Sequence, residues 1–240
     1  KKETSPVIRF DWGYASPKGN EDKYVIPLAN RKGVDYHHLK RQGMPHENII
    51  AQGPFFWGGG PFQNGTNNLH SLWSETGFKE RVAGIKVQWF NEDKDRLLTN
   101  APPRKYYAHA AKRLADLVDS IRNKYPKDTV TIISHSQGTM VAMAAVAIAR
   151  NVPDALFVLN SPYALDHNDL NGASLPADEC ISPEGRQNTL SAIIDKVASR
   201  KNHLSSLGYE GLCVGQTADK KNWRPDVALA SESGSSLAER

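Results

Sequence analysis

Apolar residues recur with regular spacing mainly in the middle of the chain. From Tyr107 to Ile121 they repeat at i, i+3 and i+4, which predicts an amphipathic helix packed on a sheet. The β-branched run 129–134 predicts a buried parallel strand, and the alanine-rich run 137–150 predicts a helix that can lie close to it. Residues 155–159 predict another strand. The order helix, strand, helix, strand requires a parallel sheet with right-handed crossovers, hence an α/β fold.

The outer parts of the chain give weaker patterns. Residues 7–10 and 85–90 predict two more strands, and 190–207 predict one more amphipathic helix. Residues 19–76 show little periodicity and are rich in Gly and Asn, which is typical of a long functional insertion. The stretch 168–186 is polar and loop-like.

The pentapeptide 134–138, Ser-His-Ser-Gln-Gly, lies where a predicted strand passes into the alanine-rich helix. α/β-hydrolases place their nucleophile at such a junction in the pattern Gly-x-Ser-x-Gly, because a bulky residue two places away would clash between strand and helix. Gly138 meets this requirement, and Ser134 nearly meets it because its side chain is small. We therefore predict that Ser136 is a nucleophile, held in a strained conformation above the carboxyl end of the sheet.

The residue after the nucleophile also has a predicted role. The backbone amide of Gln137 would open the helix and donate to the carbonyl oxygen of the substrate as that oxygen gains charge. The alternative is that Ser136 is an ordinary N-cap of the helix, a position that serine favours.

This combination predicts an α/β-hydrolase-like fold: a mostly parallel sheet with helices on both faces. We expect a single domain over 1–240 that contains the insertion 19–76 and a polar C-terminal segment, 208–240. Because the chain opens directly into a predicted strand, we expect it to be truncated at both ends.

The acid and the base are less well defined. In this fold they follow the serine along the chain, and the histidines that follow Ser136 are His167 and His203. His203 falls in the last amphipathic pattern, where an exposed helical histidine is the alternative. Asp166 precedes His167 shortly after a predicted strand and is a candidate acid, with Asp169 as its rival. A simpler expectation is that acid and base lie beyond the C-terminus and that a second oxyanion donor precedes the N-terminus.

The glycine run Trp57-Gly58-Gly59-Gly60 is similar to the oxyanion loops of lipases. Its position in the chain favours a flexible turn in a lid or wall instead. The neighbouring aromatic residues have two interpretations. In the first, they line an acyl pocket or insert at a lipid surface. In the second, they form a small core of the insertion. They are Phe55, Phe56, Trp57, Phe62 and Trp73.

Composition narrows the possible functions. Thirty Lys and Arg against 26 Asp and Glu give a net charge of +4, but the basic residues are scattered, so we expect no nucleic-acid partner. Cys180 and Cys213 are too few for a zinc site, and they are either two thiols or one bridge. We expect no metal and no cofactor. The N-terminus lacks the apolar stretch of a secretory signal, so we expect synthesis in the cytoplasm and export by another route.

The segments 7–14, 57–66 and 134–139 together resemble the third class of type VI secretion lipase effectors, with a likeness that extends over about residues 1–170. The resemblance implies an antibacterial phospholipase that is injected into the periplasm of a rival cell. It also implies a cognate immunity protein, a secretion spike protein and a native chain much longer than 240 residues. Among the candidate site residues, the resemblance implies a functional role for Ser136 alone, as the nucleophile.

The resulting hypothesis is a serine hydrolase that cleaves carboxylic esters of phospholipids at a membrane surface. One alternative is an esterase or acyltransferase that acts on small soluble esters. A second alternative is a non-catalytic module that binds a protein partner on a hydrolase scaffold.

Overall fold

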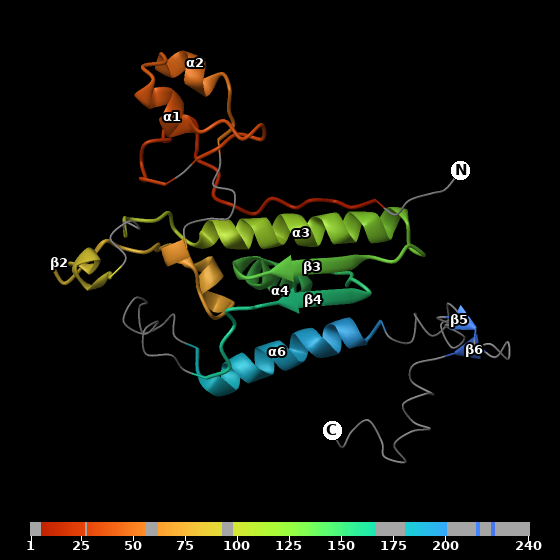
Figure 1. Ribbon diagram of the computed structural model, residues 1–240. Coiled ribbons are helices and arrows are strands. Elements are labelled where there is room, and N and C mark those ends of the chain that lie inside the picture. The colour runs from red at the N-terminus through yellow and green to blue at the C-terminus, as the bar shows by residue number, and fades with distance from the viewer. Residues whose placement is uncertain are drawn as a thin grey trace. The chain divides into compact units, whose positions relative to one another are not determined.

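A computed structural model describes residues 6–26, 28–55, 62–92, 98–166 and 181–200, together with the backbone of 215–216 and 222–223. The chain divides into two compact units, Lys1–Val197 and Ala198–Arg240 (Figure 1). The α-helices are α1 (Tyr36–Arg41), α2 (His46–Ile50), α3 (Lys105–Lys124), α4 (Gln137–Ile148) and α6 (Pro183–Ala198). The strands are β1 (Arg81–Val82), β2 (Ile85–Lys86), β3 (Thr131–His135), β4 (Ala155–Leu159), β5 (Gly215–Gln216) and β6 (Asn222–Trp223). In the second unit, β5 and β6 pair antiparallel.

The centre of the first unit is a parallel pair of strands, β3 and β4, which lie side by side in Figure 1. Their register runs from Thr131 opposite Ala155 to His135 opposite Leu159. Parallel strands need a long crossover, and α4 provides it. The predicted order of helix, strand, helix and strand in the middle of the chain is therefore confirmed.

The main core is formed by α3 and α4. Residues 138–146 of α4 are all buried. Gly138 and the alanines among them allow neighbouring elements to approach closely. The predicted amphipathic helix is confirmed as α3, whose buried residues recur at helical spacing. Ile193 of α6 also joins this core. The largest fully buried apolar side chains of the cluster are Leu72, Tyr107, Met140, Val141, Met143 and Val146.

Only one face of the parallel pair is covered in the described part of the chain. Ile132 and Leu156 pack against the main core. Ile133 and Phe157, on the opposite face, are 72% and 51% exposed. The strand predicted at 129–134 is thus confirmed as β3, but it is only partly buried and on one face only, the face on which the described helices pack.

The strand predicted at 7–10 is wrong, because the structure shows no strand there. Val7 is 97% exposed, and this stretch has no ladder with β3 or β4. The segment is instead held by side chains. Arg113 of α3 stacks on the ring of Phe10, with its guanidinium carbon 5.2 Å from the ring centroid, and donates to the carbonyl of Asp11 at 3.1 Å. β-branched residues favour a strand only where a partner strand receives them.

The strand predicted at 85–90 is correct only at its start. Ile85 and Lys86 form β2, which pairs antiparallel with β1 in a two-residue hairpin. Residues 87–90 form a 3₁₀ helix instead. The positive φ angles of Ala83 (49°) and Gly84 (83°) match the tight turn that closes such hairpins.

The region 19–76 has a small core of its own. Its buried apolar residues are Tyr36 of α1 together with Ile26, Leu28, Leu39, Ile49 and Phe55. This core supports the structural interpretation of Phe55, whereas Trp73 is 44% exposed. The glycine run 57–60 lies outside the described residues.

The last amphipathic helix is α6. It begins at Pro183, within the stretch 168–186 that the sequence indicated as a loop, so that expectation is wrong for 183–186. Leu190 and Val197 pack against the main core, as predicted. Within the described residues, no helix combines the length and the apolar character needed to cross a bilayer.

Candidate functional site

Ser136 occupies the turn between β3 and α4. Its backbone has φ 51° and ψ −132°, a strained conformation for a residue with a Cβ, which costs about 1–3 kcal/mol. Its side chain makes no capping hydrogen bond with α4, and the residue is exposed. An ordinary N-cap has extended backbone angles and accepts a hydrogen bond from the helix. The N-cap alternative therefore does not describe this serine.

Hydrogen bonds on both sides hold this strained turn in place. The Ser136 amide donates to the carbonyl of Leu159 at 2.9 Å, which extends the β3–β4 ladder by one residue. The Ser136 carbonyl accepts from the hydroxyl of buried Thr139 at 2.6 Å. The Thr139 hydroxyl also lies 2.6 Å from that of Ser161, in the loop after β4. The backbone of Ser136 is thus tied to both strands and to the helix.

The small residues on either side of Ser136 have different explanations, close packing at Gly138 and a hydrogen bond at Ser134. A Cβ on Gly138 would lie 3.2 Å from Nε1 of Trp12, so a larger side chain has little room. Ser134 donates its hydroxyl to the carbonyl of Phe157 at 2.9 Å, a contact that glycine could not make. The serine in place of the usual first glycine therefore strengthens the link between the two strands.

Gln137 is the first residue of α4, so its amide belongs to the helix turn whose N–H groups have no partner within the helix. Its side-chain oxygen accepts from the amide of Thr66 at 3.4 Å. Its side-chain nitrogen is buried and has no hydrogen-bond partner among the described residues. The loop around Thr66 thus lies beside the turn, although sequence reasoning gave that residue no role.

Buried Arg186 joins the loops around the turn, and sequence reasoning also missed it. Its guanidinium donates to the carbonyl and side-chain oxygens of Asn67 at 3.2 and 3.1 Å and to the carbonyl of Ala164 at 3.2 Å. Tyr163 donates to the Arg186 carbonyl at 2.6 Å, and burial raises the pKa of this phenol. Arg186 is one of several charged residues in the stretch 168–186, so its charge alone gave no specific signal.

Of the candidate acid and base residues, the structure describes Asp166. Asp166 lies exposed in the loop after β4, and no hydrogen bond joins it to Ser136 there. His167 and His203 lie outside the described residues, as do Cys180 and Cys213. The roles predicted for Asp166 and the two histidines therefore stay predictions.

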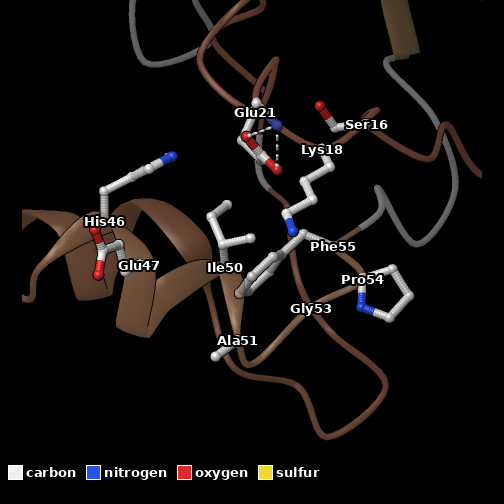
Figure 2. Close-up of a pocket in the computed structure, with 11 residues that line it drawn as sticks. Ser16, Lys18, Glu21, His46, Glu47, Ile50, Ala51, Gly53, Pro54 and Phe55 are labelled. Carbon is white, nitrogen blue, oxygen red and sulfur yellow. Dashed lines mark hydrogen bonds between the residues drawn. The ribbon is translucent and has the colours of Figure 1, made fainter.

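A separate pocket of about 530 Å³ lies between the loop 16–21 and α2, with His46, Glu47 and Phe55 in its wall (Figure 2). Ser136 does not line it. Both carboxylate oxygens of Glu21 accept from the amide of Gly19, at 3.1 and 2.9 Å, so this carboxylate closes a turn. Across the described ranges, no three His, Cys, Asp or Glu side chains gather closely enough to hold a metal ion.

The described residues thus define a mixed α/β protein with a small parallel sheet flanked by helices and an exposed serine on a strained turn between strand and helix. Residues 1–235 match the family described as the T6SS Tle3 phospholipase effector domain. The chain belongs to this family, which confirms the resemblance based on its motifs.

A similar curated protein is the "Antibacterial effector protein Tle3" of Pseudomonas aeruginosa, 31% identical over 221 residues. The match covers 89% of this chain and 29% of that protein. The chain therefore spans less than a third of the length of this relative.

Proposed function

We propose that the chain carries the nucleophile of a phospholipase that cleaves carboxylic esters of phospholipids and acts as an antibacterial effector. The observation that carries the proposal is the geometry of Ser136: an exposed hydroxyl on a positive-φ turn that begins a buried helix. A strained residue persists only where the surrounding structure holds it, and such residues cluster at active sites. Membership of a phospholipase effector family supplies the class of substrate.

In the proposed reaction, the Ser136 oxygen attacks the ester carbonyl carbon while a general base takes the serine proton. The amide of Gln137 donates to the oxygen that becomes negatively charged. Collapse of this tetrahedral intermediate breaks the ester bond, and the base returns the proton to the departing lysophospholipid oxygen. Water then attacks the acyl-enzyme, which releases the fatty acid and restores the serine. Asp166, His167 and His203 are the proposed candidates for acid and base within this chain.

The finer fold assignment belongs to the same proposal: an α/β-hydrolase-like sheet, a single domain over 1–240, an insertion at 19–76 and a polar segment at 208–240. The register of β3 and β4 and the helix that joins them support it. Sheets of parallel strands are ordinarily covered on both faces. In the proposed fold, the exposed face around Ile133 and Phe157 is the face that a second layer of helices would cover.

The proposed setting is a rival cell, which the protein enters by secretion and where it acts on periplasmic phospholipid. A spike protein that carries it and an immunity protein that neutralises it in kin cells are the proposed partners. The family description and the name of the Pseudomonas relative support this setting.

Hydrolysis of phospholipid vesicles by the full chain tests the proposal. Ser136→Ala should lower fatty-acid release by at least about 10³-fold, because the nucleophile and its base act as a unit. Ser134→Ala is the matched control: it removes a nearby hydroxyl that bonds to the Phe157 carbonyl, and most activity should remain. Equal activity of Ser136→Ala and the parent would overturn the proposal.

The same assay separates the alternatives. Faster release from vesicles than from a monomeric short-chain ester favours a phospholipase, and the reverse favours an esterase for soluble substrates. No release from either substrate by the folded, native full-length protein points to a binding module.

A further inference from the structure

The segment 79–90, which contains β1, β2 and the following 3₁₀ helix, exposes an unusual amount of apolar surface. Trp89 and Phe90 are each 77% exposed, and Val82 and Ile85 are 52% and 48% exposed. Scattered apolar residues are normal on protein surfaces, but here four exposed apolar residues fall within nine positions of one short segment. Figure 1 shows this segment in yellow around the β2 label.

The hairpin presents two different faces. Val82 lies directly opposite Ile85, and Arg81 lies directly opposite Lys86. Since side chains alternate between the faces of a strand, the two apolar residues share one face and the two cations share the other. Like charges placed directly opposite destabilise a ladder. A negatively charged surface in contact with the hairpin would relieve that repulsion.

The segment is also firmly tied at its base. The Glu80 amide donates to the side chain of Asn100 at 3.0 Å, and the Val87 amide donates to the Glu80 carbonyl at 2.8 Å. Positive φ at Ala83 and Gly84 closes the turn between the strands. The exposed side chains therefore project from a defined scaffold.

Charge and residue type together indicate the partner. Residues 79–90 carry three cations, Lys79, Arg81 and Lys86, and one acidic residue, Glu80. Exposed Trp and Phe beside Lys and Arg are typical of elements that lie in the interface of a membrane, where aromatic rings enter the headgroup region and cations contact lipid phosphates.

We propose that the segment 79–90 is a membrane-docking element that inserts Trp89 and Phe90 into the surface of an anionic phospholipid bilayer. Lys79, Arg81 and Lys86 attract the anionic surface electrostatically in this arrangement. The inference deepens the proposed function, because the docked bilayer would also be the substrate. Docking itself requires no catalysis.

The test is flotation of the full chain with vesicles of phosphatidylethanolamine and phosphatidylglycerol, in a Ser136→Ala background so that the lipid stays intact. We expect Trp89→Ser/Phe90→Ser to lower partitioning by about tenfold or more. Arg81→Gln/Lys86→Gln should lower it about fivefold per charge at low salt, and high salt or pure phosphatidylcholine should abolish that difference. Tyr125→Ser, which removes an aromatic residue 48% exposed at the end of α3, should leave binding unchanged.

Three results would overturn the inference. The parent chain fails to bind anionic vesicles, the aromatic variant binds as well as the parent, or the Tyr125 control loses as much binding as the aromatic variant. A large fall in the melting temperature of the aromatic variant, with unchanged vesicle binding, would show that the patch packs against protein. If the aromatic variant does not fold, the charge variant decides by the same criteria.

Failure of docking and failure of catalysis remain distinguishable. Flotation uses a chain without the Ser136 hydroxyl, so its outcome does not depend on Ser136 being a nucleophile. Conversely, if docking alone is lost in Trp89→Ser/Phe90→Ser with Ser136 intact, hydrolysis of a monomeric ester should continue at the parent rate.

Discussion

The buried ion pair between Arg122 and Asp154 supports the strands that present Ser136. Arg122 lies near the end of α3, and Asp154 immediately precedes β4. Their side chains are 4% and 2% exposed, and one Asp154 oxygen accepts from both the guanidinium and the Val130 amide, the latter at 2.7 Å. The Asp154 amide donates back to the Val130 carbonyl at 2.8 Å. The pair thus sets the register with which β3 and β4 begin.

Asp154→Ala should therefore be strongly destabilising. Removal of one partner of a buried pair costs about 3–5 kcal/mol, because the other charge stays buried without compensation. Arg122 keeps its hydrogen bonds to the Val152 carbonyl, at 3.3 Å, and to the Asp128 carbonyl, which moderates the loss. The Val130 amide loses its acceptor, which adds about 1 kcal/mol. We expect a total loss of about 3–4 kcal/mol.

Chemical and thermal unfolding, followed by circular dichroism, measure this loss. In a domain of this size, each kcal/mol of lost stability lowers the melting temperature by about 2–4 °C. The melting temperature of Asp154→Ala should therefore fall by about 6–16 °C. Asp128→Ala is the matched control, because Arg122 contacts only the backbone carbonyl of that exposed residue. A loss below about 1 kcal/mol for Asp154→Ala, or an equal loss for the control, would refute the assigned role of the pair.

Two further predictions concern stability. Gly77→Ala should lower the free energy of unfolding, measured in urea, by about 3 kcal/mol, because a Cβ there would meet the carbonyl oxygens of Ala101 and Pro102. A variant as stable as the parent would contradict this packing. Burial alone would raise the pKa of the Asp119 carboxyl, but hydrogen bonds led by the amide of Asn151 at 2.7 Å hold that pKa below its usual 3.8. A lowered pKa contributes stability that is present above the unfolded value and is lost as the pH falls through the folded value. Asp119→Asn should thus cost about 1 kcal/mol at pH 7 and progressively less below pH 4, and a constant difference across this range would contradict the assignment.

The middle of the fold could be predicted because local signals and tertiary packing agree there. The spacing in α3, the β-branched run of β3 and the small residues of α4 each match the element that forms. The strained turn could also be predicted from the motif at 134–138, and close packing at Gly138 explains the small residue there.

The outer elements were harder to predict because partners distant in sequence decide their structure. Residues 7–10 have strand composition but lack a ladder and instead lie against Arg113 of α3. Residues 87–90 were expected to extend a strand, but the tight turn at 83–84 forms a short hairpin before a 3₁₀ helix. No local pattern indicates that Arg186 bonds to Asn67, which is 119 positions away.

The central claim is that the Ser136 hydroxyl is a nucleophile. The most direct measurement treats the full chain with a fluorophosphonate and locates the adduct by peptide mass spectrometry, with Ser134→Ala and Ser136→Ala variants alongside. We predict a single adduct on Ser136 that persists in Ser134→Ala and disappears in Ser136→Ala. A folded chain that stays unlabelled, or that carries the label on a different serine, would contradict the account.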